Sequence, residues 1–254
     1  MLNKLKFKRI HKVTLSLLAV FLLIGLAERK HNNKYIQQIV INVEQQYDNF
    51  FVDRGDIHKL ITNDNTINII GVSMEDIDLR EIEERIKINP FVKSVDVYKD
   101  LKGTLIVNVK QRRPIARIIR NTGPDGYVGE FGAILPVSGR FTARVALISG
   151  ENVDELLKTG LVADDAKTSL LEILQFIDQH PFWKALVAQI EVGKDNELTI
   201  YPQVGKQIIS FGTPEDYEIK FRNLKIFFKE ILPQRGWNHY KRVNIKYNNQ
   251  IVCE

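Results

Sequence analysis

The apolar residues of the amino-terminal half are spaced first like those of a strand and then like those of helices. In Tyr35–Val43, the residues Ile39, Ile41 and Val43 share one face at a period of two, which predicts a β-strand. A short helix is predicted over Asp56–Ile61, directly after a turn-forming Asp-Arg-Gly sequence.

The clearest helix of the sequence is Asp78–Lys87, whose apolar residues form one stripe while the charged residues face away: Leu79, Ile82 and Ile86. Asp78 is expected to cap the first turn, and Glu81 is placed to complete a capping box. Asn89-Pro90 should end the helix, because a residue before proline avoids helical geometry.

Two strands follow, Phe91–Lys99 and Thr104–Lys110, and Asp100–Gly103 supplies a short turn between them. The order strand, helix, helix, strand, strand predicts a small α+β unit. We expect a three-stranded sheet with helices on one face.

Beyond Gln111-Arg112-Arg113-Pro114 the pattern changes to short strands, turns and longer helices. The glycine-rich stretch between residues 123 and 132 is expected to be loop. A helix is predicted over Asp165–Gln179. The predicted strands are Pro114–Arg120, Arg144–Ser149, Ile190–Val192, Leu198–Tyr201 and Gln207–Phe211. This half should form a mixed α/β domain with a mainly antiparallel sheet.

A further helix is signalled by Thr213 as its cap and Pro214 at its first position. Its apolar stripe is spaced four, three, four and three residues apart: Tyr217, Phe221, Leu224, Phe228 and Ile231. Pro233 is expected to stop it.

The last segment alternates apolar and polar residues from Val243 to Cys253, which predicts one long, half-buried strand. A terminal strand often lies at a sheet edge, where its backbone groups can pair with another chain.

At the amino terminus, the uncharged apolar segment Val13–Ala27 follows a basic arm, residues 1–12, that contains five cations and no acid. A spanning helix needs about 20 apolar residues, and flanking side chains such as Lys12 and Arg29 can lengthen this one by snorkelling. The positive-inside rule then places the arm in the cytoplasm and the rest of the chain outside. A cleaved signal peptide, ending at Gly25-Leu26-Ala27, is the alternative.

The composition argues against several functions. Apart from the five cations of the arm, Lys and Arg balance the 31 Asp and Glu, so a basic surface for nucleic acid is not expected. The single cysteine, Cys253, cannot form an internal disulfide, and the five histidines are not at metal-ligand spacing. No cofactor, metal or catalytic site is predicted. Arg112-Arg113 could contact an acidic partner, although such charge pairs are usually solvated.

Several of these sequences, in this order, resemble the FtsQ/DivIB family of bacterial cell division proteins, in the form found in Bacteroidetes-type members. The first part resembles the family's POTRA domain and the rest its β domain. The residues that carry the resemblance are Ile41–Asp56, Asp78-Leu79, Asn89-Pro90-Phe91-Val92, Val95–Tyr98, Gln111-Arg112, Pro114-Ile115-Ala116-Arg117, Pro181–Ala185, Gly236-Trp237, Asn244–Tyr247 and Gln250-Ile251-Val252.

The resemblance implies a single-pass scaffold of the division machinery in the cell inner membrane, with no enzymatic activity. It implies a transmembrane helix at 13–27, a POTRA domain with a short juxtamembrane segment at 28–110 and a β domain at 111–254. Partners of the FtsB/FtsL type would bind in the periplasm, and other division proteins could bind the POTRA domain. The implied partner-binding residues are Val243, Asn244, Ile245, Lys246, Tyr247, Asn248, Asn249, Gln250, Ile251 and Val252.

Two other interpretations stay open. Another POTRA-bearing envelope protein would fit the first domain, but the outer-membrane barrel of such a protein needs a long series of amphipathic strands. An exported cell-wall enzyme would need a catalytic site that the sequence does not reveal.

Overall fold

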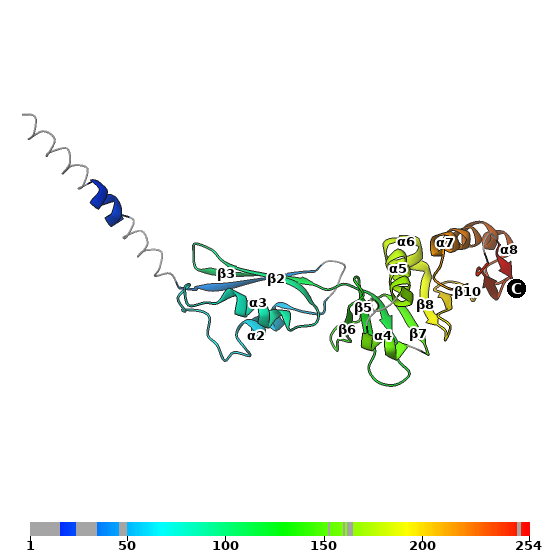
Figure 1. Cartoon of the computed structure of the whole chain (residues 1–254), viewed down its shortest axis with the longest axis horizontal. Helices are drawn as coiled ribbons and strands as arrows, with labels where there is room; N and C mark the ends of the chain where they lie inside the picture. The colour runs from blue at the N-terminus through cyan, green and yellow to red at the C-terminus, as the bar shows by residue number, and fades with distance from the viewer. Residues whose placement is uncertain are drawn as a thin grey trace, which may run out of the picture. The chain divides into compact units, whose positions relative to one another are not determined.

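The computed structural model describes residues 16–23, 35–45, 50–151, 153–159, 161, 165–247 and 250–254. The chain divides into two compact units (Figure 1). The first unit comprises Met1–Gln45 and Val52–Gln111, and the second comprises Gln46–Phe51 and Arg112–Glu254.

Residues 16–23, within the predicted membrane span, form a helix. The rest of Val13–Ala27 and the basic arm lie outside the described residues. In the part of the chain that the structure describes, no helix has the length and apolarity needed to cross a membrane.

The first unit has the predicted order of elements. They are β1 (Gln38–Glu44), α2 (Arg54–Ile61), α3 (Leu79–Lys87), β2 (Val92–Lys99) and β3 (Thr104–Gln111). The sheet order is β1-β3-β2, with β1 parallel and β2 antiparallel to the central strand. The predicted three-stranded α+β unit is therefore confirmed.

Side chains at the start of each helix satisfy its free backbone N–H groups. Asp78 accepts hydrogen bonds from the N–H groups of Arg80 (2.9 Å) and Glu81 (3.3 Å), as predicted. The reciprocal capping box, however, forms at α2, where Asp53 and Asp56 each accept from the other's backbone N–H.

The two helices bury isoleucines against one face of the sheet. Ile57 and Ile61 of α2 and Ile82 and Ile86 of α3 are fully enclosed, with the alternating valines of β2 and β3 and Leu105 beneath them. Val92 is also buried although it is out of step with Val95 and Val97. A β-bulge between Val92 and Ser94 shifts the register and explains this.

The second unit is built on one large sheet. Its elements are β4 (Pro114–Ile118), β5 (Gly126–Gly129), β6 (Ile134–Pro136), β7 (Ala146–Gly150), α4 (Val153–Thr159), α5 (Asp165–Gln179), α6 (Pro181–Leu186), β8 (Val187–Val192), β9 (Leu198–Pro202), β10 (Ile208–Gly212), α7 (Tyr217–Ile226), the π-helix η2 (Phe227–Ile231), α8 (Leu232–Arg235), β11 (Arg242–Asn244) and β12 (Val252–Cys253).

The nine strands lie in the order β12-β11-β10-β9-β8-β7-β4-β5-β6. The pairs β4–β7, β7–β8 and β10–β11 are parallel, and the remaining pairs are antiparallel, so the sheet is mainly antiparallel as expected. Helices α5, α6 and α7 lie together on one side of it (Figure 1). Their apolar residues, among them Leu174, Trp183 and Phe221, join the strands in a single core.

The glycine-rich stretch is not simply a loop, because β5 lies within it and β6 follows it directly. All four residues of β5 are buried. A Cβ at Gly126 would overlap the Leu157 side chain of α4. The glycine therefore lets the Leu157 side chain of the helix pack closely on the strand, a role that differs from the turn expected for it.

The helix after β10 begins later and ends later than predicted. The Thr213 hydroxyl contacts the Glu215 carboxylate (3.4 Å), and α7 starts at Tyr217 after Asp216, whose φ is +51°. The helix also continues through Pro233 to Arg235. The wider turn of the π-helix, in which the Leu232 N–H bonds to the Phe227 carbonyl, separates Pro233 from the preceding α-helical turn.

The second unit also includes Phe51, which lies between β1 and α2 in the sequence. Its ring packs edge-on against Phe141 (5.0 Å between centroids) and Tyr127 (5.7 Å). The ring is buried, whereas that of the neighbouring Phe50 is half exposed.

We predict that Phe51→Ala destabilises the second unit by about 3 kcal/mol, the cost of emptying a buried aromatic site. Both tryptophans, Trp183 and Trp237, belong to this unit, so urea unfolding followed by tryptophan fluorescence reports on it alone. Phe50→Ala is the control and should shift the midpoint much less. An unchanged tryptophan transition in Phe51→Ala would contradict the prediction.

Candidate docking edge at the carboxyl terminus

The strand β11 is held in the sheet by parallel pairing with β10. Ile208, Ile209 and Ser210 pair with Arg242, Val243 and Asn244. The Ile208 N–H bonds to the Lys241 carbonyl (2.9 Å) and the Ile245 N–H to the Ser210 carbonyl (3.1 Å). Val243 and Ile245 are fully buried in the core.

The chain leaves the sheet after Ile245, so the prediction of one continuous strand is wrong. The Asn244 side chain accepts the Lys246 N–H (3.0 Å), which closes a local turn in place of a strand ladder. The Lys246 ammonium forms an ion pair with Glu197, and its stem lies over Gly212. The sequence itself contains a turn signal in Asn248-Asn249, which the alternation of apolar and polar residues concealed.

The chain then returns as β12 and pairs antiparallel with β11, with Asn244 opposite Val252 and Val243 opposite Cys253. Glu254 and Arg242 exchange backbone hydrogen bonds, 3.0 and 3.1 Å long. Because backbone groups of successive strand residues point to opposite sides, the Cys253 N–H and C=O point away from β11. No strand lies beyond β12 in the described sheet, so these groups form an open edge.

The structure describes eight of the ten predicted binding residues and distributes them over two strands and the segments that join them. Val243 and Asn244 belong to β11, Ile245–Tyr247 follow it, and Val252 begins β12. Gln250 and Ile251 precede β12, while Asn248 and Asn249 lie outside the described residues. The sequence prediction omitted Cys253, whose backbone is the one that faces outward, although the same alternation included it.

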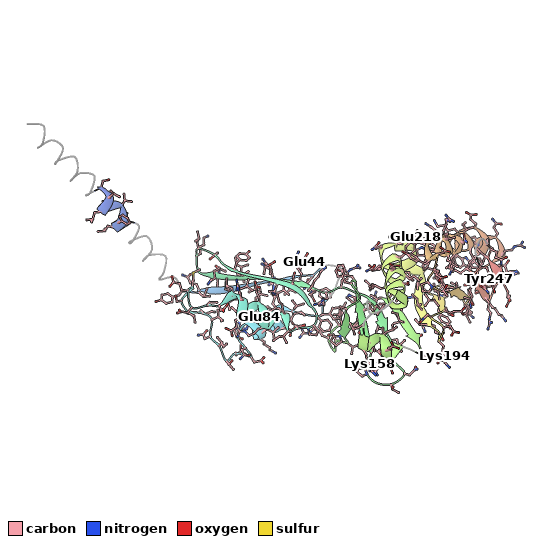
Figure 2. All side chains as sticks on the ribbon, in the orientation of Figure 1. Glu44, Glu84, Lys158, Lys194, Glu218 and Tyr247 are labelled. Atoms are coloured by element: carbon pink, nitrogen blue, oxygen red, sulfur yellow. The ribbon has the colours of Figure 1, made fainter. Side chains whose placement is uncertain are left out.

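The side chains near this edge divide into buried and exposed groups. Tyr247 projects from the surface (Figure 2), and Val252 is also exposed. Cys253 packs partly against the core, and this burial raises the pKa of its thiol.

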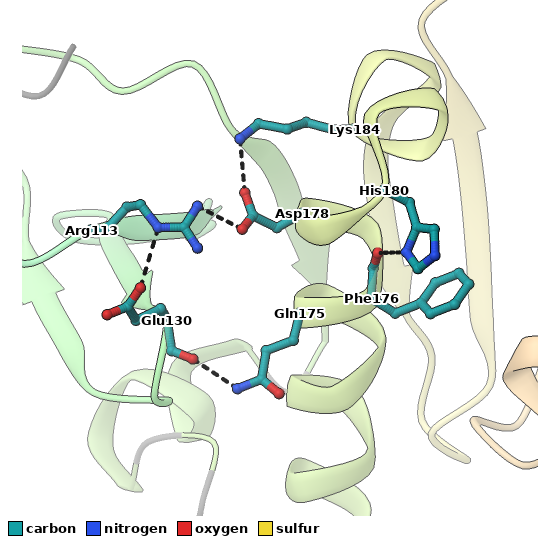
Figure 3. Close-up of polar contacts among 7 residues, drawn as sticks. All are labelled: Arg113, Glu130, Gln175, Phe176, Asp178, His180 and Lys184. Carbon is teal, nitrogen blue, oxygen red and sulfur yellow. Dashed lines mark hydrogen bonds and ion pairs between the residues drawn. The ribbon is translucent and has the colours of Figure 1, made fainter. Parts of the chain in front are cut away.

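The paired arginines were a second candidate site, but Arg113 is engaged within its own unit (Figure 3). Its guanidinium lies 2.6 Å from a carboxylate oxygen of Asp178 and 3.2 Å from one of Glu130. Lys184 contacts the other Asp178 oxygen at 2.9 Å. Burial alone would lower the pKa of Arg113, but its bonds and charge interactions with Asp178 and then Glu130 outweigh that effect and raise it. Arg113 therefore stabilises the fold and is not presented to a partner.

A pocket of about 460 Å³ lies beside this network. Its lining is mostly apolar and includes Ile115, Ile177 and Val187, and Asp178 is the one carboxylate among the lining residues. Two cations already hold that carboxylate, so the pocket has no pair of acids for hydrolysis. His180 bonds to the Phe176 carbonyl (2.8 Å), and no group of metal-ligating side chains occurs in the described part of the chain.

Comparison with known proteins agrees with this arrangement of two units. A family model described as FtsQ/DivIB, C-terminal related, matches residues 113–254, more than half of the chain. The chain belongs to the FtsQ/DivIB family. A model of a POTRA-like domain matches residues 34–110, which include β1, α2, α3, β2 and all of β3 except Gln111.

Individual members of the family are distant but extensive matches. The chain is 26% identical over 222 residues to the cell division protein FtsQ of Geotalea daltonii, covering 81% of this chain and 76% of that protein. The FtsQ of Rhodothermus marinus is 24% identical over 204 residues, covering 79% and 72%. The FtsQ of a Geobacter species is 25% identical over 211 residues, covering 77% and 72%.

We predict that Asp178→Ala lowers the free energy of unfolding by about 3 kcal/mol, because it leaves the partly buried Arg113 without its main counter-charge. Urea unfolding measures the change. Glu151→Ala, which removes the exposed ion pair with Lys194 (3.1 Å), is the control and should have no measurable effect. Equal effects of the two substitutions would show that the Asp178 network is not stabilising.

Because burial raises its pKa, the Cys253 thiol should react slowly with iodoacetamide at neutral pH. The alkylation rate should keep rising with pH beyond the point at which the urea-unfolded chain levels off. Identical pH profiles for the folded and unfolded chains would contradict this.

Proposed function

We propose that this protein is a non-enzymatic, single-pass scaffold of the bacterial division machinery. The basic arm lies in the cytoplasm, Val13–Ala27 crosses the inner membrane and the two units lie in the periplasm. The charge asymmetry of the amino terminus supports this topology, because cations flank the cytoplasmic end of a membrane span. The relatives named cell division protein FtsQ support the role in division.

The observation that carries the binding proposal is the position of β12 at the end of the sheet. A strand of a periplasmic partner would add beside β12 and bond to the outward N–H and C=O of Cys253. Backbone pairing supplies affinity for any extended segment, and the exposed side chains of Tyr247 and Val252 supply selectivity. We propose that the partner is a small single-pass coiled-coil protein of the FtsB/FtsL type.

In-cell photo-crosslinking tests the edge directly. A photo-reactive residue at Gln250 or Val252 should capture a small single-pass coiled-coil protein, identified by mass spectrometry. Val137, next to the opposite edge strand β6, is the matched control, because it is 38% exposed and Val252 is 42% exposed. Capture at Val137 but not at Val252 would reject the proposed edge.

A proline substitution isolates the backbone contribution. Cys253→Pro removes one N–H that points outward and leaves the bonds to β11 in place, as proline is tolerated on edge strands. We expect it to reduce partner capture at least about tenfold, because a ladder bond is lost and the proline ring obstructs the incoming strand. Cys253→Ala keeps the N–H and should bind normally. If folded Cys253→Pro binds as well as Cys253→Ala, strand addition at β12 is wrong.

A further inference from the structure

The large apolar side chains that are more than half exposed are unevenly distributed over the first unit. In its described residues from Tyr35 onward they are Tyr35, Ile70, Ile88 and Leu101. Three of them lie at the end where the chain enters β1, because the β2–β3 turn and the α2–α3 connection meet there (Figure 1). Scattered exposed residues need no explanation, but three large apolar side chains exposed at one end of a unit suggest a contact site.

Hydrogen bonds hold these three segments together. The Gln37 N–H bonds to the Gly103 carbonyl of the turn (2.8 Å). On the other side, the Gly71 N–H bonds to the Ile36 carbonyl (2.8 Å). The Lys99 ammonium, at the base of the turn, donates to the carbonyls of Met74 and Ile77. Tyr35, Ile70 and Leu101 are therefore held on one framework, which we call the entry end.

The turn that carries Leu101 is fixed in shape. One Asp100 carboxylate oxygen accepts the N–H groups of Lys102 and Thr104, each at 2.8 Å. Gly103 has a φ of +89°, and a Cβ there would come within 2.5 Å of the Tyr35 carbonyl oxygen. These contacts fix the shape of the turn, and the Leu101 side chain that it carries is exposed.

Chain length keeps the entry end close to the proposed membrane span. Residues 28–34 alone separate Ala27 from Tyr35. Even fully extended, this stretch covers no more than about 28 Å, at roughly 3.5 Å per residue.

We propose that the entry end rests on the lipid surface, with Leu101, Ile70 and Tyr35 in the interfacial layer. This inference depends on the proposed membrane anchoring of Val13–Ala27. Tyrosine is common at that depth, where its ring is apolar and its hydroxyl hydrated. The acidic residues of the two loops outnumber the single Lys102: they are Asp64, Glu75, Asp76, Asp78 and Asp100. Attraction to anionic lipid therefore does not hold this end, and the contact made by its apolar side chains should not weaken with salt.

Fluorescence quenching in vesicles tests the contact with the full chain. In a Cys253→Ser background, Leu101→Cys and Ile70→Cys are labelled with an environment-sensitive fluorophore and reconstituted in phosphatidylcholine vesicles that contain lipids with a doxyl quencher. Ile88→Cys is the matched control, because Ile88 is 76% exposed and Leu101 is 72% exposed. Ile88 lies near the other end of β2, about 20 Å along the strand. Leu18→Cys reports on the anchor.

Quenching at positions 101 and 70 at least threefold stronger than at 88, and unchanged in 0.5 M salt, would support the contact. If position 18 is quenched while 101 and 70 match 88, the contact is wrong and the anchor stands. If position 18 is not quenched, both the anchor and the contact are overturned.

Discussion

The structure of the second unit depends on how its open sheet ends. A sheet that does not close on itself always leaves N–H and C=O groups of its last strand without partners. Here β11 is covered by β12, which is only two residues long, so the open edge is reduced to little more than the backbone of Cys253. Such a short edge offers little to a second copy of the chain. It still offers a partner with suitable side chains a place to extend the ladder, which is why the edge carries the functional proposal.

The first unit was predictable from the sequence because its signals are local. Ile82 and Ile86 lie on one helical stripe that the spacing alone reveals, and Asp78 occupies its cap. The β-bulge after Val92 was not predicted, because it is defined by the pairing with β3. The helical stripe and its cap are determined by residues within about ten positions of one another, whereas the bulge also depends on the more distant strand β3.

The errors in the second unit come from residues whose roles depend on distant neighbours. The absence of a side chain at Gly126 makes room for Leu157 and does not serve a turn. Pro233 is accommodated within a helix because the π-helix η2 precedes it. The prediction of one terminal strand failed for a related reason. Apolar and polar residues alternate in the same way whether a strand continues or the chain turns back on itself. Asn244, whose side chain caps that turn, was the available signal, and it was assigned to a strand face. The sequence therefore predicted a strand at the carboxyl terminus, but not that the chain turns back and that β12, rather than β11, lies at the edge.

The parallel pairing of β10 with β11 has a consequence for folding. A parallel connection cannot be made by a tight turn, and here it passes through α7, the π-helix and α8 before β11 can form. Contacts that close long loops form late, because the entropy of closure is lost before the contact is gained. The β11–β12 hairpin should therefore be among the last parts of the chain to fold and among the first to open. A partner strand that pairs with β12 would then act on folding kinetics as well as on assembly, by slowing the opening of this least anchored end of the sheet.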